Sequence, residues 1–170
     1  MKKYIDPILG GLVLVVILAA SGQVRANPCP IFTTEQDVLI RMAHAVGSYH
    51  DWGYTLSAIV WKESIVGDHI VRVNSKDGDL GSFGVGQMQL TTAMYLTDTT
   101  NRWDATANLA PRLINDDVYA LELSLKYIVK HQDMTWRDMI ARYNGRGEAA
   151  RIYAEDIVRR VMLLQECLKM

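Results

Sequence analysis

Apolar residues recur at helical spacing along most of the chain after residue 33, and this pattern predicts a mainly α protein. The predicted helices span residues 35–49, 54–66, 115–131, 136–143 and 148–168. Thr33 and Gln36 have the spacing of a capping box, in which a hydroxyl and an amide satisfy free backbone groups at a helix start. The first helix is therefore expected to begin beside them.

Four of these helices carry an apolar stripe that is expected to face the core. The stripes consist of Val38, Leu39, Met42 and Val46; of Leu56, Ile59 and Val60; of Val118, Leu121, Leu125, Ile128 and Val129; and of Ile152, Ile157, Val161 and Leu164. The pattern changes between residues 67 and 86, where Gly, Asp, Asn and Ser are interrupted by short β-branched pairs. This segment predicts a Gly-rich loop or small hairpin within a mainly α (α+β) single domain.

The first 26 residues have the features of a secretory signal peptide. Two lysines precede an apolar run over residues 8–20, and a small-residue pattern ends at Ala26. The alternative is a retained membrane anchor, but the run falls short of the roughly 20 residues that span a bilayer. The expected mature chain, residues 27–170, is therefore periplasmic or secreted and has no stable membrane span.

The size and charge of the expected mature chain limit its class. Its 144 residues are enough for one domain. The formal net charge of −1 becomes −3 without residues 1–26, because that segment holds three basic residues and one acidic residue. Since nucleic-acid binding needs a clustered basic face, a nucleic-acid partner is not expected.

Both cysteines, Cys29 and Cys167, lie near the ends of the mature chain. An oxidising compartment favours a disulfide between them, and the alternative is a pair of buried thiols. Two distant cysteines do not make a metal site, and the four histidines show no ligand spacing. Asp77-Gly-Asp79 lacks the ligand alternation of a calcium loop. No metal or other cofactor is expected.

Glu63 is the candidate catalytic residue because it stands in the last turn of a helix, among apolar neighbours, just before the Gly-rich segment. An apolar cleft would raise the pKa of this carboxyl and keep a proton available near neutral pH. Such a group can protonate a glycosidic oxygen. Taken alone, a glutamate near a helix end is more often a solvated charge.

Three motifs in order change that judgement: Glu63-Ser64, then Gly84-Val-Gly86-Gln87-Met88, and later Ala141-Arg-Tyr143-Asn144-Gly145. Together they resemble the lytic transglycosylases of the goose-lysozyme-like superfamily. The greatest likeness is to small single-domain members that accompany secretion and conjugation machinery. The resemblance spans roughly residues 38–162 and implies a lysozyme-like domain. It also implies peptidoglycan glycan strands as substrate and apparatus proteins as candidate partners.

The resemblance implies a role for each matching residue. Glu63 corresponds to the acid that protonates the oxygen between MurNAc and GlcNAc and then takes the proton of the C6 hydroxyl, leaving a 1,6-anhydro-MurNAc end. Gln87 corresponds to a glycan-contacting residue and Tyr143 to one beside the catalytic carboxyl. Asn144 is expected to set the geometry of the Asn-Gly turn. In the alternative, Gln87 and Asn144 only bind loop backbone, and Tyr143 is a core aromatic.

One departure from the family pattern concerns a serine that helps to position the N-acetyl group. The loop after Glu63 is longer here, and both Ser75 and Ser82 are candidates. Ser75 is preferred because it follows Val-Asn, whereas Ser82 is expected to shape the turn before Gly84. Ser64 is expected to fix the helix end through its hydroxyl.

Two other functions remain open. A hydrolytic goose-type muramidase needs a second carboxylate, and Asp68, Asp77 or Asp79 could supply it. A non-catalytic wall-docking module would not need Glu63. Core packing is the expected role of each of the four tryptophans, and Trp61 is the first candidate for an exception that stacks on a sugar because it neighbours Glu63.

Overall fold

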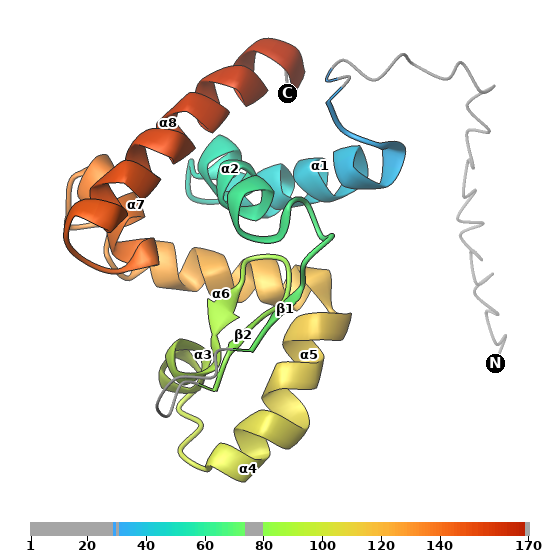
Figure 1. Cartoon of the computed structure of the whole chain (residues 1–170), viewed down its shortest axis with the longest axis vertical. Coiled ribbons are helices and arrows are strands. Elements are labelled where there is room, and N and C mark those ends of the chain that lie inside the picture. The colour runs from blue at the N-terminus through green and yellow to red at the C-terminus, as the bar shows by residue number, and fades with distance from the viewer. Residues whose placement is uncertain (1–28, 30, 74–79, 169–170) are drawn as a thin grey trace, which may run out of the picture.

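The computed structural model describes residues 29, 31–73 and 80–168. The expected signal peptide and Ser75, Asp77 and Asp79 lie outside them. The described part is mainly helical with one small antiparallel sheet, as predicted. In Figure 1, α6 (Asp117–Val129) crosses the middle of the molecule. On one side of it lie α1 (Thr34–Ser48), α2 (Gly53–Ser64) and α8 (Glu148–Leu168).

The other side of α6 holds the sheet and a run of short helical pieces. The strands are β1 (Val71–Arg72), β2 (Ser82–Phe83) and β3 (Met88–Gln89), paired in the order β1-β2-β3. The helical pieces are α3 (Leu90–Leu96), α4 (Arg102–Asp104), a π-helical turn (Ala105–Leu109) and α5 (Ala110–Asn115). The hairpin expected after Glu63 is confirmed, and β3 extends it beyond the predicted segment.

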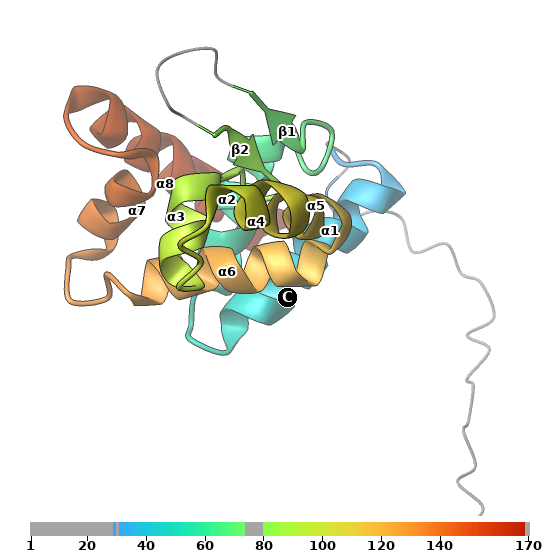
Figure 2. The same cartoon turned by 90° about the horizontal axis from the view of Figure 1, so that it is seen from below.

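The last three helices run close to their predicted bounds, and α7 spans Trp136–Asn144. Figure 2 shows α7 beside the first part of α8 at one end of the molecule. The capping box at α1 is also confirmed. Thr33 Oγ1 accepts from the Gln36 amide at 3.2 Å, and the Thr33 amide donates to Gln36 Oε1 at 3.1 Å.

Helix α2 is the centre of the core and is packed by α1, α6 and α8. Its predicted stripe is fully buried, but so are Ser57 and Ala58 on its other sides. The predicted stripes of other helices are wrong at Val38, Val118 and Ile152, which are 56%, 44% and 60% exposed. Small residues account for part of this difference, because alanines and a glycine occupy buried positions on these helices in place of larger apolar residues.

Helix α2 ends at Ser64, two residues earlier than predicted. Ile65 and Val66 have φ values of 53° and 56°, which β-branched residues rarely adopt, so the helix cannot continue through them. The Ser64 hydroxyl donates to the Val60 carbonyl at 3.1 Å and accepts from the Gly67 amide at 2.9 Å. The expected structural role of Ser64 is therefore confirmed.

Cys29 and Cys167 form a disulfide, with their Cα atoms 5.1 Å apart. The bond joins the segment before α1 to the end of α8 across a sequence separation of 138 residues. The pairing predicted from the sequence is therefore present. Within the described ranges, none of the helices has both the length and the apolar character needed to cross a membrane.

Candidate active site

Glu63 lies in the last turn of α2, at the end of the helix that packs against α8. Burial raises the pKa of its carboxyl. Three smaller effects oppose the rise: an interaction with the Tyr153 hydroxyl, and the positive charges of Lys62 and Arg72. The shift predicted from the sequence is therefore found, and Glu63 can hold a proton at a higher pH than an exposed glutamate.

Tyr153 is a neighbour of Glu63 that the sequence did not single out. It belongs to α8, is 5% exposed, and its hydroxyl makes no hydrogen bond of standard geometry with any described residue. Burial and the charge of Glu63 raise the pKa of this phenol, so it stays protonated. A neutral, buried O–H beside the carboxyl is therefore available as a donor. The available signal was a tyrosine on the buried face of an amphipathic helix.

Tyr143 connects Glu63 to the turn that contains the Gly-x-x-Gln motif. Its hydroxyl donates to the Gly86 carbonyl at 2.8 Å and lies 3.1 Å from Ser124 Oγ. Burial, and next the charge of Glu63, raise its pKa well above that of a free tyrosine. Tyr143 therefore lies within the electrostatic reach of Glu63, and its own hydroxyl is occupied in holding the turn.

The two glycines of this turn permit close packing against the helices. A Cβ on Gly84 would lie 2.3 Å from the Leu113 carbonyl oxygen, and φ at Gly84 is +75°. A Cβ on Gly86 would lie 2.2 Å from Ser124 Oγ and 3.0 Å from the Tyr143 hydroxyl. The motif needs glycine at both positions for steric reasons.

Gly86→Ala is expected to lower the free energy of unfolding by about 1–3 kcal/mol, since the new methyl overlaps Ser124 Oγ. Urea unfolding measures the loss. The matched test is the pair Gly86→Ala/Ser124→Ala, in which the overlapping oxygen is absent. The double variant is expected to lose less free energy of unfolding than the two single variants lose in sum. Strictly additive losses would show that the clash with Ser124 is not the cause.

Gln87 follows these glycines with a φ of +46°. Its Nε2 donates to the His69 carbonyl at 2.9 Å and to the Gly84 carbonyl at 3.1 Å. The amide therefore joins the turn to the segment that follows α2, which was the alternative considered for this residue. The hydrogen bond to His69 also holds the turn close to the segment that follows the end of α2.

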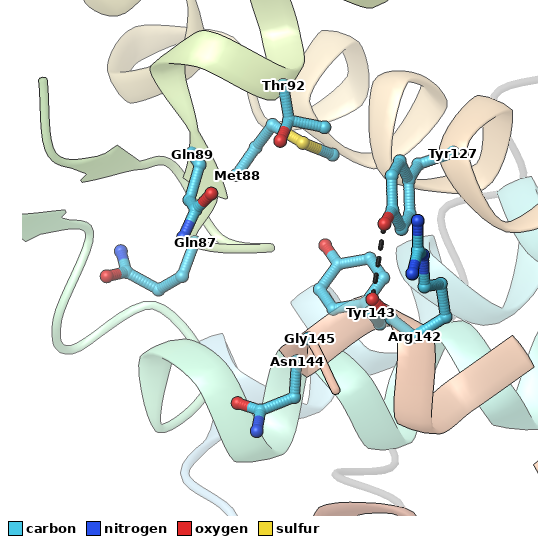
Figure 3. Close-up of a pocket in the computed structure, with 9 residues that line it drawn as sticks. All are labelled: Gln87, Met88, Gln89, Thr92, Tyr127, Arg142, Tyr143, Asn144 and Gly145. Atoms are coloured by element: carbon cyan, nitrogen blue, oxygen red, sulfur yellow. Dashed lines mark hydrogen bonds between the residues drawn. The ribbon is translucent and has the colours of Figure 1, made fainter. Parts of the chain in front are cut away.

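An open pocket lies between this turn and the end of α7 (Figure 3). Three of the predicted site residues line it, Gln87, Tyr143 and Asn144. Glu63 is not among the lining residues, but Tyr143, which lines the pocket, lies within reach of the Glu63 charge. Asn144 is exposed at the last position of α7, and Gly145, with a φ of +129°, makes the turn after it. The turn geometry assigned to Asn144 therefore belongs to Gly145.

The other predicted residues are distributed as follows. Ser82 is buried in β2, opposite Arg72 on one side and Gln89 on the other. Asp68 is held at the start of α1, where its Oδ2 accepts from Gln36 Nε2 at 3.2 Å. Ser75, Asp77 and Asp79 lie outside the described residues.

Trp61 is a packing residue, the role expected of the tryptophans by default. Its ring meets Phe32 edge to face, with centroids 5.0 Å apart, and the Arg160 guanidinium lies 4.5 Å from its centroid. Arg160 also pairs with Asp156, which binds Lys62 at 2.7 Å. Trp61 therefore helps to fix α2 against α8.

Comparison with known proteins found no matching family model, curated protein or solved structure.

Proposed function

We propose that this protein is an exported peptidoglycan lytic transglycosylase that uses Glu63 as its single catalytic acid and base. The observation that carries the proposal is a partly buried carboxyl of raised pKa that interacts with two tyrosines, at the end of the central helix. In the proposed reaction, Glu63 protonates the oxygen between MurNAc and GlcNAc as the C–O bond breaks. The carboxylate then takes the proton of the C6 hydroxyl, whose oxygen bonds to C1 and closes the 1,6-anhydro ring.

The surroundings of Glu63 support one catalytic carboxyl over two. The side chains that shift its pKa are a tyrosine, a lysine and an arginine, with no described carboxylate among them. Asp68 is committed to Gln36 at the start of α1. A two-carboxylate hydrolase holds its second acid about 5–9.5 Å from the first. Intramolecular attack by the C6 hydroxyl needs no such partner.

The Gly-x-x-Gln turn and the end of α7 are proposed as the walls that hold the glycan. Polar side chains with exposed or half-exposed ends line the pocket between them. The protein would act outside the cytoplasm, where the disulfide is stable. Glycan strands are its proposed substrate, and proteins of a secretion or conjugation apparatus are its proposed partners.

The product distinguishes this proposal from its alternatives. Purified protein is incubated with peptidoglycan sacculi, and the released fragments are analysed by mass spectrometry. We expect fragments that end in 1,6-anhydro-MurNAc, each lighter by one water than the hydrolysed form. Reducing MurNAc ends would replace the proposal with a hydrolytic muramidase, and no release at any pH would favour a wall-docking module.

A further inference from the structure

A second hollow continues the pocket between the Gly-x-x-Gln turn and α7. The two hollows share Thr92, Tyr127 and Arg142, and the second is further lined by Thr91, Tyr95, Lys130 and His131. The second hollow therefore lies over the ends of α3 and α6 and opens from the candidate active site. We call it the Lys130–Arg142 pocket.

The charged side chains that line the two hollows are basic. Lys130 and Arg142 carry positive charge, His131 is the one other ionisable base, and no Asp or Glu contributes to either lining. Neither Lys130 nor Arg142 forms an ion pair with a described carboxylate, whereas Lys62, Arg137 and Arg160 each do. A concave surface with two unneutralised cations, on a chain of net charge −1, attracts anions.

An aromatic ring holds the Lys130 cation in place. The Lys130 Nζ lies 4.0 Å from the centroid of the Tyr95 ring. The Tyr127 hydroxyl donates to the backbone carbonyl of Arg142 at 3.2 Å, a bond drawn in Figure 3, and so ties the end of α7 to α6. A side chain positioned as Lys130 is loses less freedom when it binds a ligand.

We propose that the Lys130–Arg142 pocket binds carboxylates of the peptide stem that MurNAc carries, so that the enzyme acts faster on stem-bearing glycan than on bare glycan. The ligand assignment rests on the proposed function. The stem begins at the lactyl group of the sugar and bears free carboxylates along its length. An arginine can bind a carboxylate through two parallel N–H donors, and a lysine adds a point charge.

Lys130 also has an explanation that involves no ligand. It follows the last residue of α6, where a positive charge interacts favourably with the helix dipole. That role would change stability and leave substrate preference untouched. The decisive measurement is therefore a ratio of rates on two substrates, with thermal unfolding recorded beside it.

The test uses the variant Lys130→Gln, because Lys130 lines only the second hollow whereas Arg142 also lines the pocket proposed to hold the glycan. Two substrates are compared, stem-bearing glycan strands and strands stripped of stems by an amidase. We expect kcat/KM on stem-bearing strands to fall by about tenfold, the effect of losing a partly exposed charge-assisted contact. On stripped strands we expect a change below about twofold. The matched control is Arg112→Gln, which removes a cation that stacks 3.7 Å over Tyr119 and lines neither hollow. Its rate ratio is expected to stay at the wild-type value.

A binding measurement separates this inference from the proposed function. The free tetrapeptide stem is titrated into the wild type and Lys130→Gln by NMR, and we expect binding to be about tenfold weaker in the variant. Equal rate losses on both substrates, an unchanged ratio, or equal peptide binding by both proteins would overturn the inference. If the wild type cuts neither substrate, the proposed function fails, and the peptide titration alone then decides the role of this pocket.

Discussion

Glu63→Gln is expected to lower the rate of glycan cleavage by about 10³-fold or more, since it removes the one group that gives and then takes the proton. Glutamine keeps the size of the side chain and cannot act as an acid. Release of muropeptides from sacculi at several pH values measures the effect. The matched control is Glu155→Gln on the exposed side of α8, where the carboxylate pairs with Arg137. It is expected to retain the wild-type rate.

The same substitution has an expected signature in stability. The pKa of Glu63 is raised in the folded protein, so folding becomes less favourable as the pH rises above the ordinary pKa of a glutamate, about 4.3. Glutamine does not ionise, so the free energy of unfolding of the variant does not fall with pH for this reason. We expect the two proteins to unfold at similar urea concentrations near pH 3.5, and the variant to be the more stable at pH 7.

A loss of activity together with a gain in stability is the pattern expected of a carboxyl held for chemistry. Replacing a residue that only supports the fold would lower the stability of the protein. If Glu63→Gln cleaved glycan as fast as the wild type, or if it were destabilised at pH 7, the assignment of Glu63 would be wrong. The rate of the wild type is further expected to fall as the pH rises through the pKa of Glu63, because the protonated form is the active acid.

Local patterns in the sequence were sufficient for much of this fold. The capping box at Thr33 fixed the start of α1, and the loss of helical periodicity after Glu63 marked the segment that forms β1 and β2. The long amphipathic helices were predictable because their buried faces repeat at helical spacing. Errors arose where small residues make the contact, as in α1, where Ala43 is fully buried while Val38 is exposed.

The candidate site was predictable only in part, because its residues meet through tertiary contacts. Gln87 and Tyr143 were identified from motifs, yet the structure engages both polar groups with loop backbone, at His69, Gly84 and Gly86. Tyr153 was missed, since nothing local to it indicates that its hydroxyl lies beside Glu63. The early end of α2 depends on left-handed conformations at Ile65 and Val66, which their side chains disfavour and which sequence reasoning therefore does not predict. Such strained positions cluster at functional sites.

Removing the disulfide is expected to cause the largest loss of stability. It closes a loop of 138 residues, and the double variant Cys29→Ala/Cys167→Ala frees the unfolded chain from that constraint. The expected fall in the free energy of unfolding is about 2–5 kcal/mol, a large part of the stability of an ordinary domain. Urea unfolding of the wild type and the variant measures it.

Reduction supplies the control for this prediction. Reductant is expected to lower the urea midpoint of the wild type to that of the double variant and to leave the variant unchanged. Cleavage at 25 °C is expected to survive, because Cys167 lies 14 residues beyond Tyr153 on α8, about 21 Å along the helix from the Glu63 site. The prediction fails if reductant leaves the wild-type midpoint in place. A fall in the cleavage rate of the folded variant would instead mean that the tether positions Tyr153 beside Glu63, and α8 would then transmit the constraint to the site.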